Sequence, residues 1–210
     1  MANGSEARVV VTGFRAFPGV PDNPSQRVIE YLQAHPEMLP EGAETRLFDV
    51  SYDSIEGDID AVFADPPATL VLTGYSRRAD GIVLETLATE ACDPGRLDAA
   101  GFAPVGQSEE PSACMNEAVD FGRLSSALAE RGLPCVLSRD AGAYLCNRSY
   151  RLAMQRIAER GCATRAVFVH IPAIAGTPLA GESARPMALE EIAEGVTVVA
   201  RELEEGVSPA

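Results

Sequence analysis

The order of apolar and polar positions along the chain predicts strands that alternate with helices. Short apolar runs rich in β-branched residues predict six strands, over residues 9–11, 45–50, 69–73, 82–88, 134–138 and 166–171. Apolar residues that recur three and four positions apart predict five helices, over residues 24–34, 55–63, 119–131, 143–160 and 186–204. The segment 90–116, rich in Gly, Pro, Ala and acidic residues, is expected to be a long excursion that covers the functional site.

The helix over residues 24–34 has the clearest start signal. Asn23 is a typical N-cap, Pro24 fits the first helical position, and Gln26 is placed to close a capping box. The last predicted helix carries an apolar stripe of Leu189, Ile192, Val196, Val199 and Leu203. These signals indicate amphipathic helices that pack on a sheet.

Alternating strands and helices predict the α/β class. We expect a single domain of 210 residues, built as a three-layer α/β/α sandwich with a mostly parallel, twisted sheet. Residues 1–7 and 206–210 are expected to be flexible ends. In such sheets the functional residues gather beyond the C-terminal ends of the strands. Residues 12–14, Gly74 and His170 fall at such ends.

Composition narrows the possible functions. The formal net charge is −14, and all 17 basic residues are arginines. Such a deficit of positive charge argues against binding to nucleic acid or to an anionic membrane. Five cysteines with no CxxC pair suggest neither a disulfide framework nor a zinc site. No apolar run approaches a membrane span, and the first residues lack the apolar core of a signal peptide, so we expect a cytoplasmic protein.

The segment SRDAGAYLCNRSY, residues 138–150, contains the strongest chemical signal. It places Cys146 at the start of a predicted helix, where the helix dipole favours the nucleophilic thiolate. His170 ends a predicted buried strand and could act as base and acid, and His35 is the only other histidine. A small buried cysteine and a structural core histidine are the alternative interpretations. Cys135 and Cys162 flank apolar strand segments and are expected to be such buried cysteines, and Cys92 and Cys114 lie in the loop-rich segment 90–116 and are expected to be incidental.

Two further features lie near this cysteine and histidine in the predicted fold. Glu85 interrupts the apolar run IVLETLA, where an unpaired carboxylate would be costly to bury, so it is the candidate that orients His170. Phe14 and Phe17 stand in a Gly/Pro-rich loop after the first strand, either as part of the core or as the wall of an apolar pocket. No phosphate-binding glycine motif follows them.

Four segments together resemble the pyroglutamyl-peptidase I family of cysteine exopeptidases. Their matching residues are Thr12-Gly13-Phe14, Phe17 and Asn23-Pro24-Ser25; Glu85, eleven residues after Gly74; Ser138, Ala141-Gly142, Tyr144, Cys146-Asn147 and Tyr150; and His170-Ile171-Pro172. The resemblance is ordered along the chain and covers roughly residues 8–205.

The resemblance implies hydrolysis of the amide bond after an N-terminal pyroglutamate by a Cys146, His170 and Glu85 triad. It further implies N-terminally blocked peptides as partners, no metal or organic cofactor, and a homo-oligomer, either a dimer or a tetramer. The substrate-binding residues that it implies are Phe14, Phe17, Tyr75, Leu145 and Arg96.

The loop after Gly74 departs from the family pattern. Tyr75 and the pair Arg77 and Arg78 replace a polar residue and small residues, and Glu90 replaces an asparagine. The arginines are either surface charge or, if they point inward, groups that favour an anionic substrate. A hydrolase for another N-blocked or lactam-like amide, and a non-catalytic binding protein on the same scaffold, therefore remain as alternatives.

Overall fold

The computed structural model describes residues 8–104 and 112–206. The ends predicted to be flexible lie outside these residues, except for Gly206. The central sheet has six strands in the order β2-β1-β3-β8-β4-β7. Their bounds are β1 Val9–Phe14, β2 Glu44–Phe48, β3 Thr69–Tyr75, β4 Ile82–Glu85, β7 Cys135–Ser138 and β8 Arg165–Ile171.

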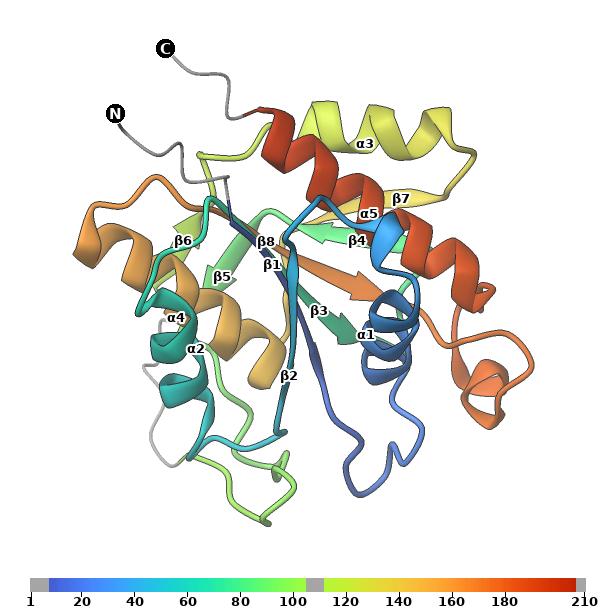
Figure 1. Cartoon of the computed structure of the whole chain (residues 1–210). Coiled ribbons are helices and arrows are strands. Elements are labelled where there is room, and N and C mark those ends of the chain that lie inside the picture. Colours follow the sequence, from blue (N-terminus) through green and yellow to red (C-terminus); the bar gives the residue numbers. More distant parts are fainter. Residues whose placement is uncertain (1–7, 105–111, 207–210) are drawn as a thin grey trace.

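Helices cover both faces of this sheet, which confirms the predicted three layers (Figure 1). One face packs on α2 and α4, and the other packs on α1, α3 and α5. The helices are α1 Pro24–Ala34, α2 Ile55–Phe63, α3 Phe121–Glu130, α4 Leu145–Arg160 and α5 Leu189–Glu205, with short 3₁₀ helices at Pro36–Met38 and Pro178–Glu182. Among the described residues, no helix is both long and apolar enough to cross a membrane.

The sheet is mostly parallel, as predicted, but it reverses at one junction. Strands β1, β2, β3 and β8 run in the same direction, whereas β4 is antiparallel to β8. Strand β7 is parallel to β4 and forms the edge of the sheet. Residues from β3 and β8 and residues from the oppositely directed β4 and β7 therefore meet on one face of the sheet.

The predicted strand over residues 82–88 is wrong as a single element. It ends at Glu85, because the backbone N–H and the hydroxyl of Thr86 both donate to the carbonyl oxygen of Ser138. The chain then turns into β5, Leu87–Thr89, which pairs with β6, Ala113–Met115, in a separate two-stranded sheet. The apolar run carries no sign of this bend, and β6 lies in the segment predicted to be irregular.

Helix starts also differ from the prediction. Asn23 caps α1 by accepting from the Ser25 N–H, but Gln26 closes no capping box, because its Oε1 accepts from the N–H of Ala16. Helices α4 and α5 begin two and three residues later than predicted, at Leu145 and Leu189. The start of α5 is delayed because Met187 pairs with the chain that follows β8.

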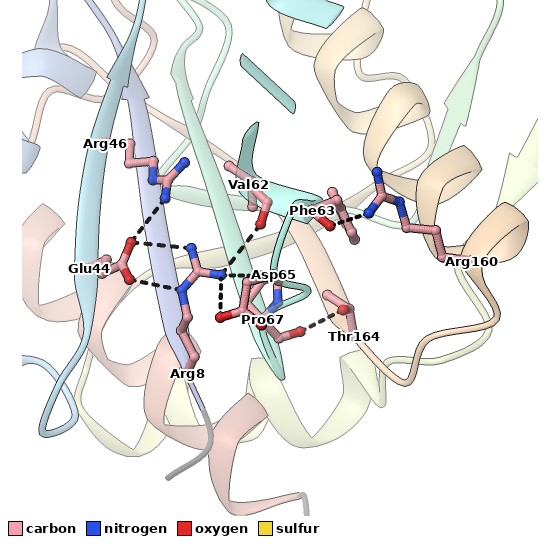
Figure 2. Close-up of polar contacts among 9 residues, drawn as sticks. All are labelled: Arg8, Glu44, Arg46, Val62, Phe63, Asp65, Pro67, Arg160 and Thr164. Carbon is pink, nitrogen blue, oxygen red and sulfur yellow. Dashed lines mark hydrogen bonds and ion pairs between the residues drawn. The ribbon is translucent and has the colours of Figure 1, made fainter. Parts of the chain in front are cut away.

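A charged network lies at the N-terminal ends of β1 and β2 and at the C-terminal end of α2 (Figure 2). Arg8 binds Glu44 of the edge strand β2 at 2.9 Å and also donates to carbonyl oxygens at the end of α2. Arg160 donates to the Phe63 carbonyl oxygen at the same helix end. These guanidinium groups satisfy carbonyls that a helix C-terminus leaves without partners, so α2 is held firmly against the sheet.

Candidate active site

A cavity of about 870 Å³ lies on the α2/α4 side of the sheet, beyond the ends of β1, β3 and β8. Five strands contribute to its wall: Phe14 comes from β1, Tyr75 from β3, His170 from β8, Val83 and Glu85 from β4, and Val136 and Ser138 from β7. The cavity thus crosses the sheet from β1 to the β7 edge. Its volume lies in the range of small-molecule sites.

Cys146 enters this cavity from the first turn of α4. The preceding loop is shaped by Gly142, whose φ of 79° favours glycine, and by Asp140, which accepts from the Gly142 N–H at 3.0 Å. The N–H groups at a helix start point toward a bound anion, and the dipole has its positive end there. The start of α4 thus places Cys146 beside backbone N–H groups that can hold an anion.

Gly74 provides the space for the sulfur of Cys146. A Cβ atom at Gly74 would lie 2.8 Å from Cys146 Sγ and 2.8 Å from Phe168 Cζ. Gly74 is paired across the β3–β8 ladder with His170. The sulfur therefore lies directly above the strand pair that carries the histidine.

His170 and Glu85 form a buried hydrogen-bonded pair, with Nδ1 of the ring 2.7 Å from Oε1 of the carboxylate. Because β4 is antiparallel to β8, His170 is paired with Val83, and Glu85 is paired with Phe168. Glu85 is therefore a diagonal neighbour of His170 on the same face of the sheet, within reach of its ring. Glu85 is only 1% exposed.

Two neighbours change the protonation of His170. Burial by itself lowers the pKa of His170, but hydrogen bonds to Cys146 and Glu85 outweigh that effect and raise this pKa to about 9. The ring is therefore an imidazolium at neutral pH that donates to both neighbours. The stability that this proton adds is fully present below the unfolded-state pKa of about 6.5 and is lost as the pH rises through about 9.

A second buried network holds the backbone of Glu85. The Tyr150 hydroxyl donates to the Glu85 carbonyl oxygen at 3.0 Å. The Asn116 amide donates to the Tyr150 oxygen at 2.8 Å and to the Ala166 carbonyl oxygen at 2.7 Å. Tyr150 stands one turn after Cys146 on α4, so the helix that presents the sulfur also fixes the strand that presents the carboxylate.

Asn147 anchors the same helix on its other neighbour, β5. Its side-chain oxygen accepts from the Thr89 N–H at 2.8 Å, and its amide donates to the carbonyl oxygens of Thr89 and Ala91.

Asn116 was not predicted from the sequence to be part of the site. Its position in the irregular-looking segment 90–116 gave no signal.

The β1 side of the cavity is aromatic. Phe14 packs edge-on against Phe48, with 6.2 Å between the ring centroids, and Phe17 lies 6.4 Å from the ring of Tyr144. The Leu145 side chain is buried in the core beneath the cavity, so the contribution of Leu145 to the wall is largely its backbone.

Arg96 and Tyr75 also line the cavity. The Arg96 guanidinium lies 4.1 Å above the centre of the Tyr144 ring. The Tyr75 hydroxyl is buried and has no hydrogen-bond partner among the described residues. Among the described residues of the segment predicted to cover the site, Arg96 lines the cavity. Residues 105–111 of that segment lie outside the described residues.

Arg77 and Arg78 lie at the rim of the cavity. Arg77 forms an ion pair with Glu182 at 3.0 Å, and its side chain is 55% exposed. Arg78 lies 3.8 Å from Asp140 and is 82% exposed. Both arginines thus match the surface-charge alternative rather than the inward-pointing one.

Two of the other cysteines differ from the prediction. Cys135 and Cys162, expected to be buried, are both partly exposed, as are Cys92, Cys114 and Cys146. Among the described residues, no group of three or more His, Cys, Asp or Glu side chains could hold a metal ion.

A family model described as pyroglutamyl peptidase matches residues 7–205 of this chain. The chain belongs to the pyroglutamyl peptidase family. It is 30% identical over 200 residues to a pyrrolidone-carboxylate peptidase of Vibrio vulnificus, covering 91% of this chain and 90% of that relative. It is 29% identical over 197 residues to one of Thermococcus kodakarensis, covering 91% and 93%.

Solved structures of pyroglutamyl peptidases share the fold of this chain. Pyroglutamyl peptidase I of Bacillus amyloliquefaciens is similar with a TM-score of 0.83 at 24% identity, covering 95% of this chain and 98% of that one. A mutant pyrrolidone carboxyl peptidase from Pyrococcus furiosus gives a TM-score of 0.84 at 24% identity, covering 96% and 100%.

Replacing Gly74 by alanine is expected to displace the sulfur of Cys146, because the new methyl group would lie 2.8 Å from that sulfur. The folded variant should react with iodoacetamide at least ~10-fold more slowly at Cys146, since the thiolate would lose its neighbours. Gly57→Ala is the matched control: it has open space in α2, so alkylation should not change. An unchanged alkylation rate in Gly74→Ala would contradict the close contact.

Glu85→Gln should lower the pKa of His170, because the amide keeps the shape but loses the charge that favours the imidazolium. The measurement is the NMR titration of the imidazole protons, which is simple because the chain contains two histidines. The His35 signal serves as an internal reference. A His170 midpoint at the same pH in both proteins would show that the carboxylate does not control the ring.

Tyr150→Phe removes the hydroxyl that binds the Glu85 carbonyl oxygen and leaves the Asn116 amide short of an acceptor. We expect a loss of about 1–3 kcal/mol in the free energy of unfolding, together with slower alkylation of Cys146 in the folded protein. Tyr31→Phe, at a partly exposed tyrosine stacked on His35, is the control for loss of a hydroxyl. Full thiol reactivity in Tyr150→Phe would limit this tyrosine to a structural role.

Proposed function

We propose that this chain is a cysteine exopeptidase that hydrolyses the amide bond after an N-terminal pyroglutamate, with Cys146, His170 and Glu85 as its catalytic residues. The observation that carries the proposal is the 2.7 Å contact between His170 Nδ1 and Glu85, with the other side of the ring beside Cys146 at a helix start. Family membership supports the same reaction.

The proposed reaction begins with attack of the Cys146 thiolate on the carbonyl carbon of pyroglutamate. Backbone N–H groups at the start of α4 stabilise the resulting oxyanion. His170 then gives its proton to the departing amine nitrogen as the C–N bond breaks, which leaves a thioester on the sulfur. Neutral His170 takes a proton from water, the hydroxide attacks the thioester, and pyroglutamate and Cys146 are released.

The aromatic side of the cavity suits the pyroglutamyl ring. The lactam carries no ammonium group, so an apolar wall accommodates it without a carboxylate to balance a charge. Phe14 and Phe17 would contact its ring, and backbone groups at Leu145 would bind its amide. The unpartnered Tyr75 hydroxyl is a further donor at this wall, and Arg96 closes it next to Tyr144.

The same geometry weighs against a purely binding role. A buried carboxylate and imidazolium are costly to place in a protein interior unless they pair, and here the pair extends to the nucleophile. A hydrolase for another N-blocked amide would use the same three residues. That alternative differs from the proposed function only in how the wall of the cavity contacts the substrate. The predicted homo-oligomer, a dimer or a tetramer, remains a prediction.

Cys146→Ala should abolish hydrolysis of a pyroglutamyl amide while the protein stays folded, because no other group forms the thioester. Wild-type protein should be labelled first at Cys146 by iodoacetamide, with activity lost in proportion. All five cysteines are partly exposed, so burial alone does not single out Cys146 for labelling. Cys162→Ala is the control and should keep full activity. Hydrolysis by Cys146→Ala would rule out the cysteine mechanism.

A further inference from the structure

We propose that the cavity floor over β4 and β7 binds the peptide on the leaving side of the scissile bond, with preference for apolar side chains in its first residues. This inference rests on the proposed function and adds a peptide subsite to it. The floor is formed by Val83 and Val136, and neither takes part in the chemistry.

Strand pairing places these valines in line with the catalytic residues. Gly74 is paired with His170, His170 with Val83, and Val83 with Val136. Paired residues of neighbouring strands point to the same face of a sheet, and strands lie about 4.8 Å apart. The row from Gly74, which lies beneath the sulfur, to Val136 is therefore roughly 14 Å long, enough for about three or four extended residues.

The two sides of the sulfur differ in how open they are. On the β1 side, Phe14 is 5% exposed, and β2 continues the sheet beyond it. On the other side, Val136 is 42% exposed, and β7 is the last strand (Figure 1). An exopeptidase must enclose a small terminal group and let a chain of any length leave. The closed side thus fits the lactam, and the open side fits the leaving peptide.

The chemistry of the floor indicates apolar residues. Val83 and Val136 form a paired apolar surface, and the only polar neighbour on the same face of β7, Ser138, already accepts from the Asp140 N–H at 3.0 Å. The rim charges are compensated, because Arg77 is paired with Glu182 and Arg78 with Asp140. An anionic side chain would therefore compete with carboxylates for these arginines.

Strand β7 supplies its own control. Leu137 is 48% exposed, close to the 42% of Val136, but successive side chains of a strand point to opposite faces. Val136→Ser and Leu137→Ser thus make the same kind of change at similar exposure, one inside the cavity and one outside it. Val136→Thr, which nearly keeps the volume of valine, is the second variant should the serine variant fold poorly.

The test uses pyroglutamyl-Gly-Gly-Gly amide, the three variants with one glycine replaced by leucine, and the three matching variants with one glycine replaced by glutamate. In wild type, at least one leucine peptide should exceed the all-glycine peptide in kcat/KM by about three- to tenfold, as expected for partial burial of an apolar side chain. This ratio should fall toward one in Val136→Ser or Val136→Thr and stay unchanged in Leu137→Ser.

Three other outcomes are distinguishable. Hydrolysis with the same leucine-to-glycine ratio in wild type and both Val136 variants would overturn the subsite and leave the proposed function standing. A preference for glutamate peptides that disappears in the Arg77→Gly, Arg78→Gly double variant would overturn the apolar assignment in favour of an anionic one. No hydrolysis of any peptide by wild type would remove the proposed function and the subsite together.

Discussion

The contact between Glu85 and His170 is the interaction on which the rest of the site depends. An ionised carboxylate that is 1% exposed is unfavourable unless a cation and hydrogen bonds compensate for its lost hydration. His170 supplies the cation, and its proton is held because the sulfur of Cys146 lies on the other side of the ring. The three groups therefore depend on one another, and removing one leaves the others in an unfavourable environment.

This contact requires the reversal of strand direction between β8 and β4. In the antiparallel register, Val83 stands opposite His170, and Glu85 lies diagonally across from it. The same register carries an apolar row on to Val136 at the edge of the sheet. A single topological feature thus sets both the charge pair and the floor of the cavity.

The sequence was sufficient to predict the layers and most elements. The structure brings Cys146, His170 and Glu85 to one cavity, and their catalytic roles remain a prediction. Periodicity and caps are local signals, and an acidic residue inside an apolar run is a visible anomaly. The split at Thr86 and the pairing of β5 with β6 depend on hydrogen bonds to distant carbonyls, which periodicity does not record. The roles of Asn116 and of the compensated rim arginines likewise arise from tertiary contacts. The missing capping box at Gln26 also results from a tertiary contact, because the Gln26 side chain accepts from the N–H of Ala16 instead.

The position of β8 in the sheet has a consequence for synthesis. Among the described residues it is the last strand along the chain, yet it lies between β3 and β4 at the centre of the sheet. Glu85 and His170 are 85 residues apart in the chain, and closing such a long loop is slow compared with local folding. On the ribosome, the two strand groups can meet only after residues 165–171 have left the exit tunnel. The nascent chain therefore acquires its buried charge pair, next to Cys146, only after all six strands of the sheet have been synthesised.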